Sequence, residues 1–215
     1  MITIATLLWD ANENSLPFSR SYDESWVEKL YRGFARNLTV PFRFQCWSNR
    51  MRTYSETAIR PSFLGFNPSY GDCMYPLTTG EPTILVGLDT VVLRNIDHLA
   101  QWCLTPGDKL GLPRDPFHWS QACNGVILAP ENFCGPHRRL DRDVNDMDWC
   151  RAQPHVFIDD IFSGSVKSYK GHVRGMTDHF AGHPQGFDGI DICYLHGVPK
   201  QDMLGDIPEI AENWK

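Results

Sequence analysis

The first fifty residues alternate between apolar strand-like runs and one amphipathic segment, and this order constrains the fold more than any other feature of the sequence. Residues 2–8 are an apolar, partly β-branched run that predicts a buried strand. Apolar side chains then recur at helical spacing over residues 23–38, where Asp23 or Ser25 is the expected N-cap. Residues 42–47 alternate like a second strand. A strand–helix–strand opening is typical of an α/β protein with a mostly parallel central sheet flanked by helices.

The composition fits a single domain over residues 1–215. Hydrophobic residues make up 42% of the chain and charged residues 21%, which excludes wholesale disorder and allows a sizeable core. The net charge of -6 argues against a nucleic-acid partner bound by a broad basic face. A small anionic ligand needs only a local pocket and stays compatible with this charge.

The sequence also predicts a soluble, cytoplasmic protein. The first ten residues carry no basic region and no small-residue cleavage site, and no apolar run is long enough for a membrane span. The seven cysteines are odd in number, and no two of them form a CxxC pair. This pattern indicates reduced, mostly buried thiols rather than a disulfide framework.

The remaining segments are expected to complete the sheet and its connections. Residues 50–81 are rich in Gly, Pro and aromatic residues without a clear period, which predicts a long functional loop. Residues 201–215 are predicted to form a polar C-terminal tail. Further strands are expected within residues 84–88, 121–130, 163–175 and 189–197, and further helices within residues 95–104 and 136–153.

Four predicted strands carry polar groups at one end: Trp9-Asp10, Asp89, Asn124 and His196. In open α/β sheets, ligands bind beyond the carboxyl ends of the strands. An aspartate and a neutral imidazole can share a divalent cation, and the cation can neutralise a diphosphate, so a metal is the expected counter-charge of Asp89. Each group also has a purely structural interpretation, with Asp89 as a cap, His196 as a hydrogen-bonded residue and Asn124 as part of a turn.

Six ordered segments resemble glycosyltransferases of the GT-A fold, near the family 8 group that contains glycogenin and bacterial galactosyltransferases. The likeness is closest to small bacterial and phage members of that group. Residues 82–99 resemble the segment that carries the family's DxD motif, and YLHGVPK at residues 194–200 resembles its last block. The other similar segments are residues 21–49, CNGVIL at 123–128, FIDDIF at 157–162 and VKSYKGH at 166–172, so residues 50–81 and 131–152 fall outside the resemblance.

The resemblance implies a single Rossmann-like GT-A domain that moves a sugar from a UDP-sugar to an acceptor with Mn²⁺ or Mg²⁺. The acceptor would be a glycan, a protein or a small molecule. Asp89 and His196 would hold the metal. Lys200 would act as a catalytic residue that stabilises the departing diphosphate, and Gly197 would let the backbone approach it. Asn124 would lie near the donor sugar.

Five weaker candidates follow from the same resemblance. Asp159 or Asp160 would lie near the acceptor and the reacting carbon as a catalytic residue. Thr6, Trp9 and Tyr22 would form the pocket for the base and the ribose. The resemblance favours transfer with retention of configuration.

Two positions depart from the family's pattern. The first acid of DxD is Gly87, so the motif reads GLD, and IDD at residues 158–160 lacks the family's glutamine. Because hard cations depend on the number of charged oxygens, three outcomes follow: a weaker metal site, replacement by another acid such as Asp10, or a protein that binds without turnover. The alternative function is therefore a catalytically impaired nucleotide-sugar-binding protein.

A third hypothesis is a metal hydrolase built on the histidine-rich residues 171–183. His179 and His183 have the i,i+4 spacing of a helical zinc pair, and His172 precedes them. However, Gly and Pro within the segment disfavour a helix, and no Glu lies between the two histidines as in HExxH. The preferred interpretation is a solvated loop that can close over the donor site.

Overall fold

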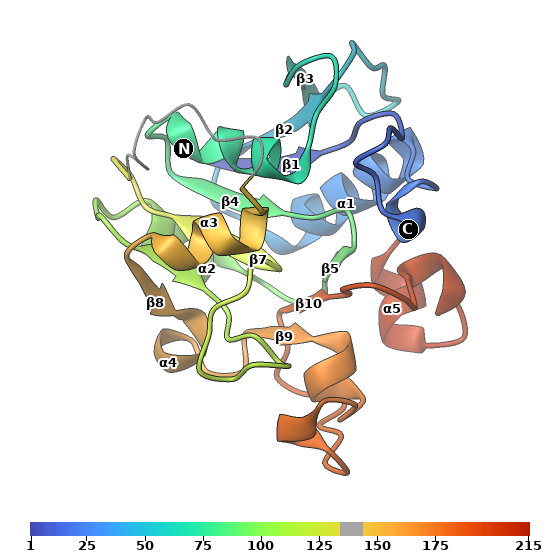
Figure 1. Ribbon diagram of the computed structural model, residues 1–215, viewed down its shortest axis with the longest axis vertical. Helices are drawn as coiled ribbons and strands as arrows, with labels where there is room; N and C mark the ends of the chain where they lie inside the picture. Colours follow the sequence, from blue (N-terminus) through green and yellow to red (C-terminus); the bar gives the residue numbers. More distant parts are fainter. Residues whose placement is uncertain (134–143) are drawn as a thin grey trace.

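The computed structural model describes residues 1–133 and 144–215, and its centre is a seven-stranded sheet of order β3-β2-β1-β4-β7-β6-β8 (Figure 1). Only β7 runs antiparallel to its neighbours, so the predicted α/β class with a mostly parallel sheet is confirmed. The strands are β1 (Ile2–Leu7), β2 (Phe42–Ser48), β3 (Ile59–Phe63), β4 (Thr83–Val86), β6 (Leu110–Leu112), β7 (Val126–Ala129) and β8 (His155–Phe157). A smaller sheet of order β5-β10-β9 consists of β5 (Thr90–Val92), β10 (Ile192–Tyr194) and β9 (Val166–Ser168).

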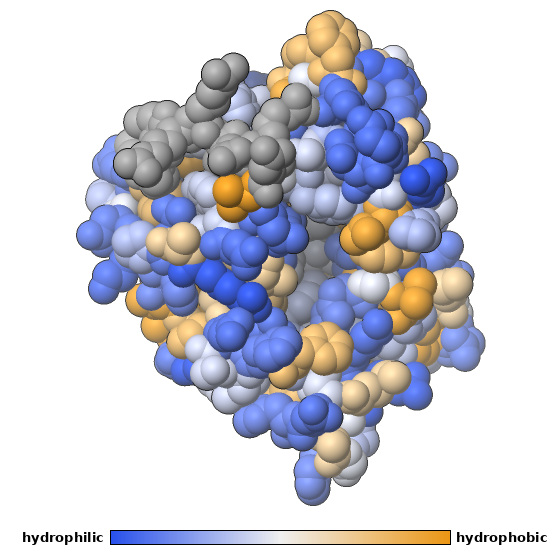
Figure 2. Space-filling view, viewed as in Figure 1, coloured by the Kyte–Doolittle hydropathy of each residue, from blue (hydrophilic) through white to orange (hydrophobic). Residues whose placement is uncertain are grey.

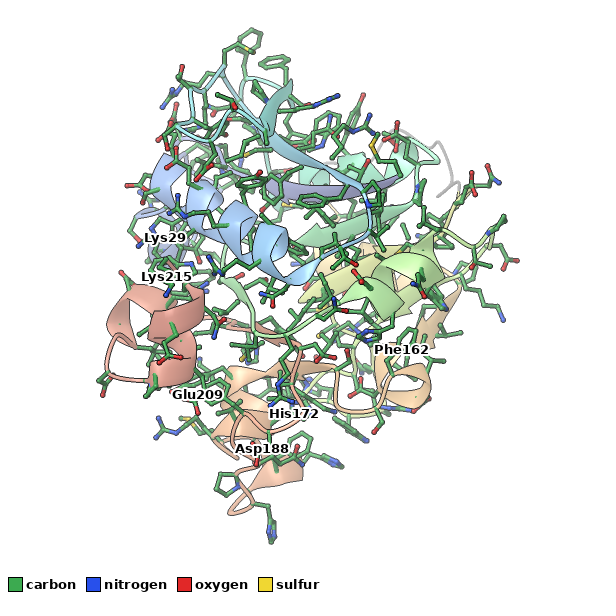
Figure 3. The ribbon with its side chains drawn as sticks, turned by 180° about the vertical axis from the view of Figure 1, so that it is seen from behind. Lys29, Phe162, His172, Asp188, Glu209 and Lys215 are labelled. Carbon is green, nitrogen blue, oxygen red and sulfur yellow. The ribbon has the colours of Figure 1, made fainter. Side chains whose placement is uncertain are left out.

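Helices cover both faces of the large sheet because successive strand side chains point to opposite faces. On one face, which is nearer the viewer in Figure 3, α1 (Glu24–Asn37) and α2 (Asp97–Cys103) pack on alternate residues such as Ile84 and Val86. On the other face, α3 (Asp146–Ala152) and the 3₁₀ helix η2 (Tyr70–Thr78) pack around Leu85. The helix predicted over residues 23–38 is confirmed as α1, with Asp23 as its N-cap.

The prediction that residues 50–81 form one long loop is wrong. This segment contains the edge strand β3 and η2, which buries Met74 and Leu77. The strand escaped notice because it is mostly exposed and contains Pro61, a residue that sheets tolerate mainly at their edges. The 3₁₀ helix escaped notice because its period of three residues differs from the helical period of 3.6.

The prediction of a polar C-terminal tail is also wrong. Residues 201–203 form a 3₁₀ turn, η5 (Gln201–Met203), and α5 (Pro208–Asn213) follows, with Ile210 fully buried. The Trp214 ring then lies 4.6 Å from the ring of Trp26 on α1, and the Lys29 ammonium lies 3.8 Å from the centre of the Trp214 ring. This packing fixes the C-terminal residues against the first helix.

The other predicted elements are shorter than their sequence windows. The window 163–175 holds β9 and a π-helical turn, η3 (Tyr169–Val173). In the window 136–153, residues 144–153 are described and contain α3, whereas residues 136–143 lie outside the described residues. One-turn helices are α4 (Ile158–Ile161), η1 (Pro17–Ser19) and η4 (Asp178–Phe180). The six cysteines in the described part of the chain are free thiols, as predicted. No helix within the described residues is long and apolar enough to cross a membrane.

Candidate nucleotide-binding site

The carboxyl ends of β1 and β4 open into a cavity of about 380 Å³, the hollow near the middle of the face in Figure 2. Ligands of open α/β sheets bind at such strand ends, and small-molecule sites commonly measure about 300–1,000 Å³. The lining comes from seven segments: residues 7–9, 16–22, 70–74, 85–89, 124–127, 145–147 and 194–197.

One wall of the cavity is aromatic. Trp9, Phe18, Tyr22 and Tyr70 line it, and the rings of Trp9 and Tyr70 meet edge to face at 5.8 Å. The indole N–H of Trp9 donates to Oγ of Ser15 at 3.2 Å, which holds the loop after β1 over the cavity. Burial raises the pKa of Tyr22, so its hydroxyl stays neutral at physiological pH. Such rings offer flat faces on which a nucleobase can stack.

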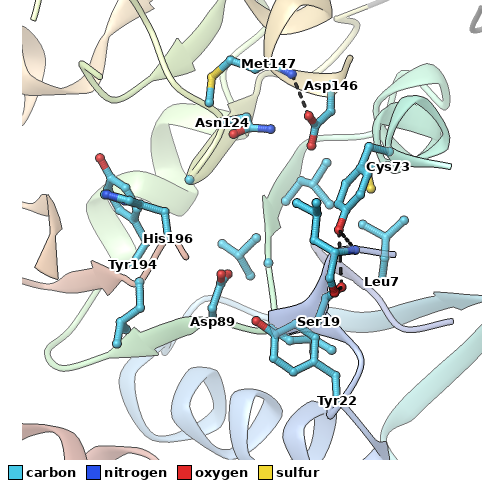
Figure 4. A pocket seen from close by; sticks show the side chains of 18 of the residues that line it. Leu7, Ser19, Tyr22, Cys73, Asp89, Asn124, Asp146, Met147, Tyr194 and His196 are labelled. Atoms are coloured by element: carbon cyan, nitrogen blue, oxygen red, sulfur yellow. Dashed lines mark hydrogen bonds between the residues drawn. The ribbon is translucent and has the colours of Figure 1, made fainter. Parts of the chain in front are cut away.

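Asp89 lies beside Tyr22 in the cavity (Figure 4). Its counter-charge is the ammonium of Lys200. Lys200 is 3% exposed, and its Nζ also donates to the carbonyl of Leu195 at 2.7 Å. The same ammonium lies 4.6 Å from the centre of the Phe18 ring, a favourable cation–π geometry. The sequence suggested a metal as the balancing charge, whereas the structure supplies it from a lysine 111 residues further along the chain.

Two glycines shape the backbone around this ion pair. A Cβ at Gly87 would lie 2.5 Å from Oδ1 of Asp89, so the carboxylate folds back over the position that an acid occupies in a DxD motif. Gly197 has a φ of +62°, a left-handed conformation that favours glycine, and a Cβ there would lie 3.1 Å from Nζ of Lys170. Both positions therefore leave room for a neighbouring charged group instead of a side chain.

His196 lines the cavity, as do Tyr194 and Gly197. Figure 4 shows the side chains of His196 and Tyr194. Nδ1 of His196 is 3.4 Å from Oγ of Ser168, and its buried Nε2 has no partner among the described residues. Burial first and the Lys170 charge second lower the pKa of His196 to about 4, so the ring is neutral at pH 7. A neutral imidazole is the form that binds metals.

The residues as placed nevertheless do not fit a divalent ion. Asp89 is committed to Lys200, Gly87 offers no oxygen, and Asp10 pairs with Arg50 and Arg52 at 2.8 and 2.9 Å outside the cavity lining. Within residues 1–133 and 144–215, no three His, Cys, Asp or Glu side chains gather as a metal site. The described residues offer one carboxylate and one imidazole, and the carboxylate is already paired with Lys200, so a divalent ion would have to take most of its oxygen ligands from phosphate and water.

The far side of the cavity carries a second carboxylate, Asp146, which sequence analysis missed. Asp146 begins α3 and faces Asn124 across from Asp89 (Figure 4), and the backbone N–H of Met147 donates to its Oδ1 at 2.9 Å. Burial raises the pKa of Asp146, and hydrogen bonds from Met147 and Asn124 oppose this rise only in part. Residues 145–146 carried a helix-start signal, but only the packing of α3 on η2 brings them to the site.

Four predicted residues do not line the cavity, namely Lys200, which lies behind Asp89, and Thr6, Asp159 and Asp160. Thr6 is fully buried and donates to the carbonyl of Val86 at 2.9 Å, which ties β1 to β4. Asp159, on α4, accepts from the Arg114 N–H at 2.8 Å and from Lys167 at 3.0 Å. Asp160 is mostly exposed and pairs with the Arg114 guanidinium through both oxygens.

The remaining predictions converge on one place. Six predicted residues line the cavity, and Lys200 lies directly behind Asp89. The six are Trp9, Tyr22, Asp89, Asn124, His196 and Gly197.

The histidine-rich segment does not form a zinc pair. His172 is 1% exposed within η3, and its Nδ1 accepts from the Ser168 N–H at 3.2 Å. His179 stacks on Trp119, with ring centres 4.3 Å apart, and η4 is a single turn that ends before His183. The expected solvated loop is thus partly a packed aromatic cluster, and nothing in its geometry favours a metal hydrolase.

Comparison with known proteins supports the fold assignment. No protein-family profile matches this sequence, and no curated protein sequence matches it either. Among solved structures, an active-site mutant of LgtC matches with a TM-score of 0.54 and 12% identity, over 93% of this chain and 89% of that one. The glycosyltransferase GlyE of Streptococcus pneumoniae TIGR4 matches with a TM-score of 0.60 and 11% identity, over 93% of this chain and 55% of that one. The bifunctional glycosyltransferase WbbM matches with a TM-score of 0.58 and 10% identity, over 99% of this chain and 50% of that one.

These likenesses define the class of fold. The chain has a GT-A-like glycosyltransferase fold, built on the seven-stranded sheet. It spans about half the length of GlyE and WbbM, and most of the length of LgtC.

Proposed function

We propose that this protein is a glycosyltransferase that binds a nucleotide-sugar donor, a UDP-sugar, in the strand-end cavity. The observation that carries the proposal is the convergence on one cavity of an aromatic wall, a buried ammonium and two acid or amide groups on the opposite side. The wall suits the base, the Lys200 region suits the diphosphate, and Asn124 with Asp146 suits the sugar hydroxyls. The glycosyltransferase neighbours support this assignment through their shared fold.

The proposed chemistry requires charge stabilisation more than covalent catalysis. Breaking the bond between the anomeric carbon and the diphosphate leaves negative charge on the leaving group, and an ammonium in a dry site stabilises that charge electrostatically. Lys200 is the group assigned to this role. The family resemblance suggested Mn²⁺ or Mg²⁺ as well, but the donor set described above supports no step through a metal.

Asp159 and Asp160 have a different proposed role from the one that the resemblance implied. Their ion pairs with Lys167 and Arg114 tie β9 and the segment after β6 to α4, outside the cavity. We therefore assign the carboxylate nearest the sugar to Asp146, and the acceptor stays open among glycans, proteins and small molecules. Free thiols at six cysteines favour the cytoplasm as the place where the protein acts.

One specific observation favours the alternative function, a nucleotide-sugar-binding protein without turnover. The Gly87 position has no space for the side chain of an acid while Asp89 keeps its present orientation, so the first acid of the motif is missing and a substitution at residue 87 does not restore it unless Asp89 moves. The two functions differ in whether the donor is consumed or only bound.

A two-stage experiment tests the proposal. Thermal melts with UDP, GDP and ADP come first, and a ligand at about a hundred times its Kd should add roughly 2.7 kcal/mol, or about 5–10 °C. Phosphorus NMR of UDP-glucose and UDP-galactose then follows the release of UDP. No shift with any nucleotide overturns the proposal, whereas a UDP shift without UDP release supports the binding protein.

A matched pair of variants localises the sugar end of the site. Asp146→Asn should lower donor turnover because it changes the carboxyl group that faces Asn124. Asp148→Asn removes an exposed carboxylate from the same helix and should leave turnover unchanged. Equal losses in both variants would contradict the placement of the sugar.

A further inference from the structure

The turn at residues 195–197 brings a buried ammonium group to the edge of the cavity. Lys200 donates to the Leu195 carbonyl and pairs with Asp89, while the backbone N–H of Leu195 donates to the Asp89 carbonyl at 2.8 Å. The aromatic rings of Phe18 and Tyr22 lie 4.6 and 5.9 Å from the same ammonium. Lys200 is therefore held in place by four groups before any ligand arrives.

A second ammonium group lies against the same turn. Nζ of Lys170 is 3.1 Å from the position that a Cβ would take on Gly197, a residue that lines the cavity. Lys170 is half-buried, and no ion pair among the described residues includes it. An unpaired, half-buried ammonium beside a binding cavity is poised to meet an anion.

The charges around this turn favour an anion over a cation. Lys170 and Lys200 together carry two positive charges, and among the residues that the structure describes Asp89 is the one carboxylate paired with them, so this turn has one positive charge in excess. A divalent cation at Asp89 would have to displace Lys200 and would still face the repulsion of both ammonium groups. A diphosphate, in contrast, can accept charge-assisted hydrogen bonds from both of them.

We infer that Lys170 and Lys200 together bind the diphosphate of the donor beside Gly197, and that nucleotide binding needs no divalent ion. The inference rests on the proposed function and adds to it a second phosphate-binding residue and an ion requirement. Gly87 fits this arrangement, because a second acid at the motif would neutralise the charge that the lysines provide.

Calorimetric titration of UDP into the intact protein tests the inference, in excess EDTA and in excess MnCl₂. The expected result is the same Kd in both buffers, within about twofold. Lys170→Met should weaken UDP binding about tenfold or more, since a hydrogen bond to a charged group contributes about 1.5–3 kcal/mol and 1.4 kcal/mol is tenfold. The control Lys109→Met removes an exposed lysine that does not line the cavity and should leave the Kd unchanged. Uridine, which has no phosphate, should bind Lys170→Met as it binds the original protein.

Asp89→Asn distinguishes the lysine pair from a metal site. It releases Lys200 for the diphosphate while keeping the shape of residue 89, so UDP should bind in EDTA as tightly as before or more tightly. If Asp89 held a metal, this change would abolish Mn²⁺-dependent binding. Lys200→Met alone leaves a half-buried carboxylate unpaired and therefore destabilises the protein. The double variant Asp89→Asn/Lys200→Met removes both charges, so the protein should stay folded and the variant can test Lys200. It should weaken UDP binding about tenfold.

The outcomes separate the inference from the proposed function. UDP binding that appears only with MnCl₂ overturns the inference and leaves the glycosyltransferase proposal in place. An unchanged Kd in Lys170→Met also overturns the inference. Absence of UDP binding in both buffers, with the protein folded, overturns the proposed function and the inference with it.

Discussion

Replacing Lys200 by Met removes the ammonium from its ion pair and leaves the Asp89 carboxylate behind. Removing one partner of a fully buried pair costs about 3–5 kcal/mol. Lys200 is almost fully buried, but the Asp89 side chain is 25% exposed, so water solvates part of the orphaned charge. We therefore expect Lys200→Met to lower the free energy of unfolding by about 2–3 kcal/mol.

Urea unfolding followed by circular dichroism measures this loss, and a thermal melt should show a Tm lower by about 5–10 °C. The double variant Asp89→Asn/Lys200→Met removes both charges and should recover most of the loss, which a double-mutant cycle quantifies. A cost below about 0.5 kcal/mol for Lys200→Met would refute the reasoning. A double variant as unstable as the single one would refute it too, because the cost would then come from lost packing.

Three further predictions follow from the same structure. Gly87→Asp should lower the Tm by the same amount in MnCl₂ and in EDTA, because the new Cβ meets Oδ1 of Asp89 instead of completing a metal site; a Tm that rises only with Mn²⁺ would contradict this. Ile210→Ala should cost about 2–5 kcal/mol in urea unfolding, since this residue of α5 is fully buried, whereas the exposed control Glu212→Ala should cost little. Burial lowers the pKa of His172 to about 4. As pH falls from about 6.5 to about 4, the unfolded chain binds a proton on this residue before the folded protein does, so the free energy of unfolding decreases over that range. His172→Asn should flatten this loss in unfolding curves measured across that window, and an unchanged pH profile would show that the ring titrates normally.

The fold was predictable where an element leaves a local signature in the sequence. α1 was found from its helical spacing of apolar residues and β2 from its alternation, whereas β1 and β4 were found as short apolar runs that are buried on both faces. β3 and α5 were missed because an edge strand and a two-turn helix bury too few residues for a period to show. Their assignment depends on partners far away in the sequence, such as Trp26 for Trp214.

The residues of the candidate site also divide into those that the sequence predicted and those that only the structure revealed. The sequence by itself determined that Asp89, Asn124 and His196 stand next to strands, because strand positions follow from local pattern. The tertiary structure decided that they meet at one cavity, since Asn124 precedes the antiparallel strand β7 and His196 follows β10 of the smaller sheet. Only the tertiary structure decided that Lys200 balances Asp89, that Lys170 lies against the Gly197 turn and that Asp146 closes the far side. The physical reason is that ion pairing acts through space between residues whose separation along the chain carries no information, so it is settled by packing and not by periodicity.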